Sequence, residues 1–220
     1  MIDSSQNELD KITNLAELLQ YRALHQKNQT AYTFLVDGER ESISLTYQEL
    51  DRMARGIAAQ LQLVPPGDSA LLLYPPGLEF IAAFFGCLYA GVIAVPVYPP
   101  TKNYQISQLQ VIITDAQATV LLTTKSILDK IKNQPTESSE LVKLPYLATD
   151  NLPDPPNQEL NLYSAKPETI AFLQYSPSNT ARPRGAKISH DNLMHNECTI
   201  IESLWTYREK CHCQLFASLP

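Results

Sequence analysis

Residues 70–100 read ALLLYPPGLEFIAAFFGCLYAGVIAVPVYPP, and this stretch decides the fold. The unbroken apolar run from Ala70 to Tyr74 is typical of a parallel strand that is covered on both faces and has no polar side to expose. Pro76-Gly77 predicts a turn into an apolar helix that ends near Gly91, because glycine commonly follows the last turn of a helix. Ile93 to Val97 predicts a second strand. A strand, a helix and a strand in this order indicate a parallel βαβ unit.

Further helices and strands are expected on both sides of this unit. Thr46-Tyr47-Gln48-Glu49 is a capping box, and it predicts a helix that begins there and runs to about Gln62. The other expected helices cover residues 14–26, 103–117, 126–132 and 191–205, and the other expected strands cover residues 31–36, 42–45, 118–123, 145–148, 169–175 and 186–189. Residues 133–160 are polar and rich in proline, and we interpret them as an internal connection around the short strand at 145–148. The alternation predicts an α/β fold with a mostly parallel sheet flanked by helices.

Composition excludes several classes of protein. The chain has 220 residues, of which 44% are hydrophobic, so it can bury a real core. Its net charge of −6 argues against a nucleic acid or an anionic membrane surface as partner, because both favour a basic face. The apolar stretch from Phe80 to Val95 is shorter than the roughly 20 residues that span a bilayer, so no membrane span is expected. The first 25 residues lack the apolar segment of a secretory signal, and the four cysteines form no disulfide framework, which predicts a cytoplasmic chain.

Chemistry is expected in residues 175–185, which read YSPSNTARPRG between two predicted strands. A phosphate site needs hydroxyl and backbone N–H donors and a cation for the outer oxygens, and this segment supplies hydroxyls and arginines. The candidate phosphate-binding residues are Ser176, Ser178, Asn179, Thr180, Arg184 and Gly185. A solvated loop of a hairpin is the alternative interpretation of the same residues. No residue is assigned as catalytic and no metal site is expected, since Cys211-His212-Cys213 lacks the spacing of a zinc site.

The residues resemble a known family. Leu173-Gln174-Tyr175, Pro183-Arg184-Gly185 and the segment Ser189 to Asn196 are similar to the phosphate-loop region of fatty acyl-AMP ligases, which belong to the acyl-adenylate-forming superfamily. The segments 71–80, 82–100 and 45–50 resemble the same family in their residues and in their order along the chain. The resemblance runs from about residue 15 to the end of the chain. It implies that residues 1–220 form the N-terminal subdomain of such a ligase, as a shortened AMP-binding region.

The resemblance also implies an activity. Fatty acyl-AMP ligases join a fatty acid to AMP from ATP with Mg²⁺, release pyrophosphate and usually pass the acyl group to an acyl-carrier protein. In this chain Ser176 falls on the first hydroxyl of the family's phosphate loop, Thr180 on its later threonine and Gly185 on the glycine near its end. Arg184 falls on the lysine that precedes this glycine.

Four further positions depart from the family pattern. Pro177 and Asn179 replace serines, and Ser178 and Ala181 replace the two loop glycines, while Arg184 keeps the charge of the lysine in a bulkier form. These changes remove an N–H donor and limit the close approach of the backbone, so they predict weak ATP binding. Full-length members are more than twice as long, and we expect this chain not to complete the reaction alone and to need a polypeptide that supplies the missing half. The alternative is a non-catalytic remnant or binding module that keeps the fold without the activity.

Overall fold

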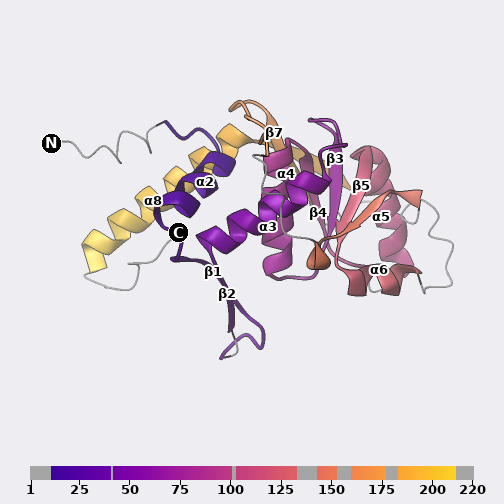
Figure 1. Ribbon diagram of the computed structural model, residues 1–220, viewed down its shortest axis with the longest axis horizontal. Coiled ribbons are helices and arrows are strands. Elements are labelled where there is room, and N and C mark those ends of the chain that lie inside the picture. The colour runs from indigo at the N-terminus through magenta and orange to yellow at the C-terminus, as the bar shows by residue number, and fades with distance from the viewer. Residues whose placement is uncertain are drawn as a thin grey trace.

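The computed structural model describes residues 11–40, 42–100, 103–132, 143–152, 160–176 and 183–211. Within these residues a six-stranded sheet has the order β6-β5-β3-β4-β7-β8. Figure 1 labels β3, β4, β5 and β7 of this sheet. The strands are β3 (Ser69–Leu73), β4 (Ile93–Val97), β5 (Ala118–Thr123), β6 (Tyr146–Ala148), β7 (Ile170–Ser176) and β8 (Arg184–Ser189). All neighbours pair in parallel except β8, which runs antiparallel to β7. The predicted α/β fold with a mostly parallel sheet is confirmed.

The βαβ unit predicted from residues 70–100 forms the centre of the sheet. β3 pairs with β4 in parallel from Ser69↔Ile93 to Leu73↔Val97, and every residue of β3 is buried. Helix α4 (Leu78–Ala90) connects the two strands and ends at Gly91, whose φ of +71° is left-handed. A Cβ atom at Gly91 would lie 2.5 Å from Cγ of Tyr163, so the turn has no room for a side chain.

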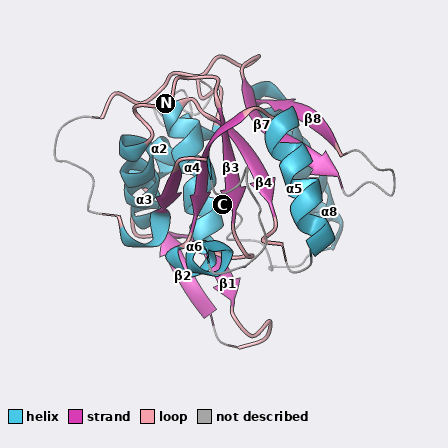
Figure 2. Cartoon of the chain, turned by 90° about the vertical axis from the view of Figure 1, so that its right-hand side faces the viewer, coloured by secondary structure: helices cyan, strands magenta, loops and turns pink. Residues whose placement is uncertain are grey.

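Helices cover both faces of this sheet. Helices α2 (Leu15–His25), α3 (Tyr47–Gln60) and α4 share one core with Ala70 and Leu72 of β3. Helices α5 (Asn103–Asp115) and α6 (Lys125–Lys132) share a second core with Leu71 and Leu73. Figure 2 shows α3 and α5 on opposite sides of the strands. Because successive side chains of β3 enter different cores, its sequence is apolar at every position.

A hairpin and a long helix complete the described chain. β1 (Thr30–Leu35) and β2 (Ser42–Thr46) pair antiparallel and extend away from the large sheet (Figure 1). The predicted capping box opens α3: Glu49 N donates to Thr46 Oγ1 at 3.2 Å, and Thr46 N donates to Glu49 Oε2 at 2.8 Å. Helix α8 (His190–Cys211) follows β8 directly and is longer than the expected 191–205.

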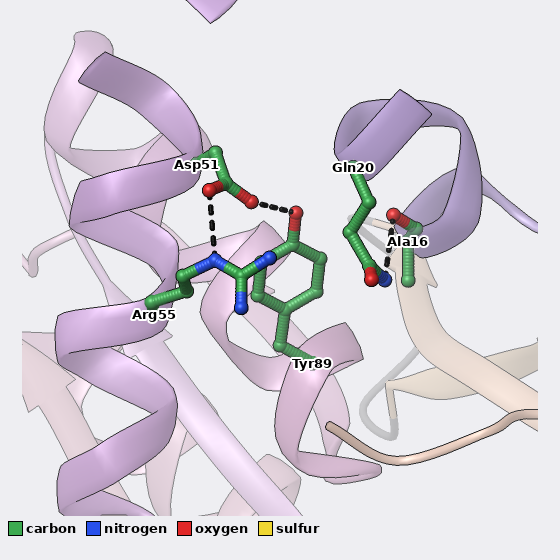
Figure 3. Close-up of polar contacts among 5 residues, drawn as sticks. All are labelled: Ala16, Gln20, Asp51, Arg55 and Tyr89. Carbon is green, nitrogen blue, oxygen red and sulfur yellow. Dashed lines mark hydrogen bonds and ion pairs between the residues drawn. The ribbon is translucent and has the colours of Figure 1, made fainter. Parts of the chain in front are cut away.

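A polar cluster joins α3 to α4 (Figure 3). Tyr89 Oη donates to Asp51 Oδ1 at 2.6 Å, and Arg55 Nε donates to Asp51 Oδ2 at 2.7 Å. Tyr89 is only 1% exposed, and burial raises the pKa of its hydroxyl well above the usual range. The carboxylate therefore accepts from a buried neutral hydroxyl on one oxygen and from a guanidinium on the other.

The expected internal connection 133–160 lies mostly outside the described residues. Of the expected connection 133–160, the described residues are 143–152 and 160, and they contain β6 and a short 3₁₀ helix η1 (Thr149–Asn151). Among the helices of the described ranges, none combines the length and apolar character needed to cross a bilayer.

Candidate functional site

The strands β3, β4 and β7 run parallel, so their carboxyl ends meet at one edge of the sheet. In open α/β sheets ligands bind in the crevice outside these ends. A cavity of about 960 Å³ lies there, near the upper limit of the roughly 300–1,000 Å³ typical of small-molecule sites. It is lined by Tyr74 and Gly77 after β3, by Val97 and Tyr98 at the end of β4, by Tyr175 of β7 and by Pro183 before β8.

Apolar side chains form most of the cavity wall. From α4 come Phe80, Ile81 and Phe84, and from α5 come Leu109 and Ile112. The ring of Phe84 packs edge-on against Phe172 of β7, with 5.7 Å between ring centroids. The two helices lie on opposite faces of the sheet, so the cavity passes over the strand ends from one face to the other. A wall of this kind suits the hydrocarbon part of a ligand.

The end of the β7–β8 hairpin at which the two strands are connected borders this cavity through Tyr175 and Pro183. Tyr175 pairs with Gly185, and Ser176, the last residue of β7, pairs with Arg184, the first residue of β8. Arg184 is exposed, so its guanidinium is available to a ligand anion. The other three predicted phosphate-binding residues, Ser178, Asn179 and Thr180, lie outside the described residues.

Strand β8 begins earlier than the sequence indicates. The expected strand started at Ala186, which placed Arg184 and Gly185 in the loop, whereas both belong to the strand. Glycine weakens strand interiors because it has no side chain to pack, so Gly185 carries no strand signal in the sequence. Here the ring of Tyr175 occupies the space beside Gly185: a Cβ atom at 185 would lie 2.7 Å from Tyr175 Cζ. Gly185 therefore has a packing reason of its own, independent of any phosphate.

Tyr175 also connects β7 to helix α5. Its Oη donates to Asp115 Oδ2 at 2.6 Å, across 60 residues of sequence. Burial, together with the neighbouring carboxylate, raises the pKa of Tyr175 well above its usual range. At neutral pH the hydroxyl is therefore a permanent donor. The sequence marked Tyr175 as the start of the hydroxyl-rich segment but carried no signal for its partner, because Asp115 belongs to no recognisable pattern.

Hydroxyl groups also connect the end of β3 to η1 and to β5. Tyr74 and Thr149 share a hydrogen bond of 2.7 Å, and Thr123 Oγ1 donates to Leu73 O at 2.7 Å. Burial raises the pKa of Tyr74 well above its usual range, so its hydroxyl stays neutral. These contacts fix the wall of the cavity at the point where the chain leaves β3.

His190, the first residue of α8, is 3% exposed and lies apart from the cavity lining. Its Nδ1 is buried without a hydrogen-bond partner among the described residues, and burial lowers its pKa, an effect that Glu17 opposes. The helix is capped instead by Ser189 and Asn192: each backbone N–H donates to the other side chain, at 3.1 and 3.2 Å. In the described ranges, no group of three or more His, Cys, Asp or Glu side chains could hold a metal ion.

Curated relatives are fatty-acid ligases. The chain is 43% identical over 202 residues to the medium-chain-fatty-acid–[acyl-carrier-protein] ligase JamA of Moorena producens, covering 90% of this chain and 34% of that protein. It is 33% identical over 186 residues to the long-chain-fatty-acid–AMP ligase FadD32 of Mycolicibacterium smegmatis, covering 80% of this chain and 29% of that protein. The chain thus spans about a third of the length of these relatives and matches their N-terminal portion.

Solved structures agree with these relatives. A fatty acid AMP ligase from Legionella pneumophila superposes with a TM-score of 0.78 at 37% identity, over 86% of this chain and 32% of that one. A fatty acyl-adenylate ligase from the same organism, in complex with acyl adenylate and pyrophosphate, superposes with a TM-score of 0.77 at 37% identity, over the same shares of the two chains. Residues 19–218 match the family described as AMP-binding enzyme. The chain belongs to the AMP-binding enzyme family, and its fold is that of the N-terminal domain of acyl-adenylate ligases.

Proposed function

We propose that this chain is the N-terminal region of an enzyme that activates a fatty acid with ATP, forming an acyl-adenylate and pyrophosphate. The observation that carries the proposal is a juxtaposition: the apolar cavity is lined by Tyr175 and Pro183, which are the chain neighbours of the paired residues Ser176 and Arg184. Activation of a fatty acid needs a hydrocarbon site and an anion site side by side, because the reacting carboxylate joins the two.

The reaction assigns a task to each part of the site. A carboxylate oxygen of the fatty acid attacks the α-phosphorus of ATP, and the bond from this phosphorus to the bridging oxygen of the β-phosphate breaks. The electron pair of that bond leaves with pyrophosphate. The chain's contribution is to position the two anions and to offset the charge that develops on the leaving group. We assign the outer phosphates to Arg184 and to hydroxyl donors at Ser176 and Thr180.

We assign the acyl chain to the cavity wall formed by α4, β4 and α5. Phe80, Phe84 and Ile112 present rings and alkyl groups there, and burial of each CH₂ of a fatty acid gives about 0.8 kcal/mol. The Legionella ligase binds acyl adenylate, which supports a fatty acyl substrate for this chain. JamA acts on an acyl-carrier protein, and we propose a carrier protein as acceptor here as well.

We propose that Mg²⁺ arrives with the nucleotide. Mg²⁺ in such sites is usually held by substrate phosphates with one or two carboxylates, rather than by a protein cage. The chain corresponds to about a third of its relatives, so we further propose that complete adenylation needs the remaining regions. The cytoplasmic location expected from the sequence remains part of this proposal.

Calorimetric titration of the folded chain with Mg-ATP tests the anion site. The matched variants are Arg184→Ala and Lys187→Ala, which remove one positive charge each from exposed positions of β8. A guanidinium–phosphate contact contributes about 1.5–3 kcal/mol, so we expect Arg184→Ala to weaken binding at least about tenfold. Lys187→Ala should change the affinity less than about twofold, because only general charge screening differs.

Two results separate the proposal from its alternative. A folded chain that gives no heat with Mg-ATP, even after the changes Ser178→Gly, Ala181→Gly and Arg184→Lys, supports a non-catalytic remnant. Equal losses in the two charge variants would contradict the assignment of Arg184, because they would mean that overall charge, not a contact, attracts the nucleotide.

A further inference from the structure

One connection beside the site has no task in the proposed chemistry. Asp115 is the last residue of α5, a helix without basic residues in its last turn, and it accepts from Tyr175 Oη at 2.6 Å. A carboxylate at the carboxyl end of a helix is disfavoured by the helix dipole. The helix itself therefore gives no reason for an acidic residue at this position. What the carboxylate does provide is a fixed acceptor for a hydroxyl that comes from β7.

The same tyrosine determines the backbone at Gly185. Tyr175 is 8% exposed and lies opposite Gly185 in the β7–β8 ladder. A Cβ atom at 185 would lie 2.7 Å from Tyr175 Cζ and 3.0 Å from its Oη. The ring therefore fills the place of the missing side chain, and the hydroxyl passes beyond it to reach Asp115. A movement of the ring would disturb both the hydrogen bond and the backbone of β8.

The next step in the ladder is the proposed anion site. Ser176 and Arg184 form the pair that follows Tyr175 and Gly185, and no further pair of this ladder lies among the described residues. Ladder ends fray unless something holds them. The carboxylate of Asp115 holds Tyr175, which belongs to the pair before the last one of the ladder. This contact limits how far the end of the hairpin can move relative to α5, a helix whose Leu109 and Ile112 line the cavity.

We propose that Asp115 and Tyr175 are positioning residues, which fix the Ser176–Arg184 pair beside the cavity-lining Tyr175 and Pro183 by tying this end of β7 and β8 to helix α5. The inference rests on the proposed function, since it concerns the same anion site. It adds Asp115, which no sequence pattern marked, and gives Tyr175 a role other than contact with phosphate. Neither residue needs to touch a substrate for this role.

The variant Tyr175→Phe removes the hydroxyl and keeps the ring beside Gly185. Its matched control is Tyr89→Phe, which removes a hydroxyl that also donates to a carboxylate at 2.6 Å, but between α3 and α4. Asp115→Ala removes the acceptor, whereas Asp115→Asn keeps an acceptor oxygen and should rescue the connection. All four variants are compared at equal distance from their urea midpoints, so that global stability does not decide the result.

Hydrogen–deuterium exchange gives a readout that needs no ligand. We expect the β7 and β8 amides of residues 173–176 and 184–187 to exchange about tenfold faster in Tyr175→Phe and Asp115→Ala, the factor that corresponds to one lost hydrogen bond. Tyr89→Phe and Asp115→Asn should leave these amides near the wild-type rate. In parallel, the affinity for Mg-ATP should fall about tenfold in the first two variants and less than about twofold in the other two.

The failures of the two proposals are distinguishable. Absence of Mg-ATP binding by the wild type refutes the proposed function, and the exchange rates then decide whether Asp115 and Tyr175 hold the hairpin end. Exchange in Tyr175→Phe that matches Tyr89→Phe would overturn the inference. So would faster exchange without any loss of affinity in a chain that binds Mg-ATP, because the connection would then stabilise the sheet without positioning the site.

Discussion

Removing the carboxylate of Asp51 tests how much the buried hydrogen bond between α3 and α4 contributes to the free energy of unfolding. Asp51→Ala takes away the acceptor of Tyr89 Oη and the partner of Arg55 Nε. Tyr89 is 1% exposed, so its hydroxyl is left buried without a partner, which costs about 1–3 kcal/mol. The side chain of Arg55 is 32% exposed and can be rehydrated, so its ion pair adds at most about 0.5 kcal/mol. We expect a total loss of roughly 2 kcal/mol in the free energy of unfolding.

The double variant gives the sharper result. Tyr89→Phe alone should cost about 0.5–1.5 kcal/mol, because Arg55 still satisfies the carboxylate. Asp51→Ala/Tyr89→Phe should be more stable than Asp51→Ala, since no hydroxyl is left unsatisfied. Urea denaturation followed by circular dichroism measures all three, and with a slope of about 2 kcal/mol/M the single Asp51 variant should shift the midpoint by roughly 1 M. Asp129→Ala on the exposed side of α6 is the control. Additive losses in the double variant would refute the reasoning.

Three further changes test other parts of the fold. Gly91→Ala should lower the free energy of unfolding by more than about 2 kcal/mol, because it adds a clash with the ring of Tyr163 to a left-handed strain of about 1 kcal/mol. Gly38 also has a positive φ but lies in open space, so Gly38→Ala should show the strain alone. Urea midpoints compare the two variants. His190 is buried and its pKa is lowered, so it takes up a proton more readily in the unfolded chain than in the folded one. The free energy of unfolding should therefore be highest above the ordinary histidine pKa of about 6.5 and fall as the pH drops below it. Thermal melts between pH 5 and 8 should show a smaller fall in His190→Gln. Phe80→Asp puts a charge at the cavity wall, although aspartate suits the first turn of α4. Displacement of a fluorescent fatty acid should show that this variant binds fatty acid at least about tenfold more weakly. Ile43→Asp, on the exposed hairpin, should not weaken this binding.

The order of strands and helices could be predicted because it depends on local patterns. Residues 70–74 are apolar at every position because their side chains pack alternately into two cores. Thr46 and Glu49 predict the start of α3 because the side chain of each can bond the backbone of the other, three residues away. Such signals are contained in a few neighbouring residues. The sheet order required packing between distant segments, whereas the antiparallel pairing of β7 with β8 is local and corresponds to the hairpin that was the alternative interpretation of residues 175–185.

The site was only partly predictable for the same reason. The hydroxyl-rich segment after Tyr175 pointed to the hairpin end, but the apolar cavity beside it is assembled from α4, β4, α5 and β7, and no one stretch contains it. The contact from Tyr175 to Asp115 joins residues 60 positions apart, and nothing local distinguishes this aspartate from an exposed one. Gly185 was assigned to phosphate binding, yet its immediate neighbour is the ring of Tyr175.

The central claim is that one crevice receives a fatty acid and the phosphates of ATP side by side. It is tested most directly by ³¹P NMR of Mg-ATP bound to the chain, in the presence of a fatty acid that carries a nitroxide near its carboxyl group. The account predicts that the nitroxide broadens the α-phosphate signal most, that the unlabelled fatty acid does not broaden it, and that Arg184→Ala abolishes the effect. Phosphate signals that stay sharp while both ligands are bound would contradict the account.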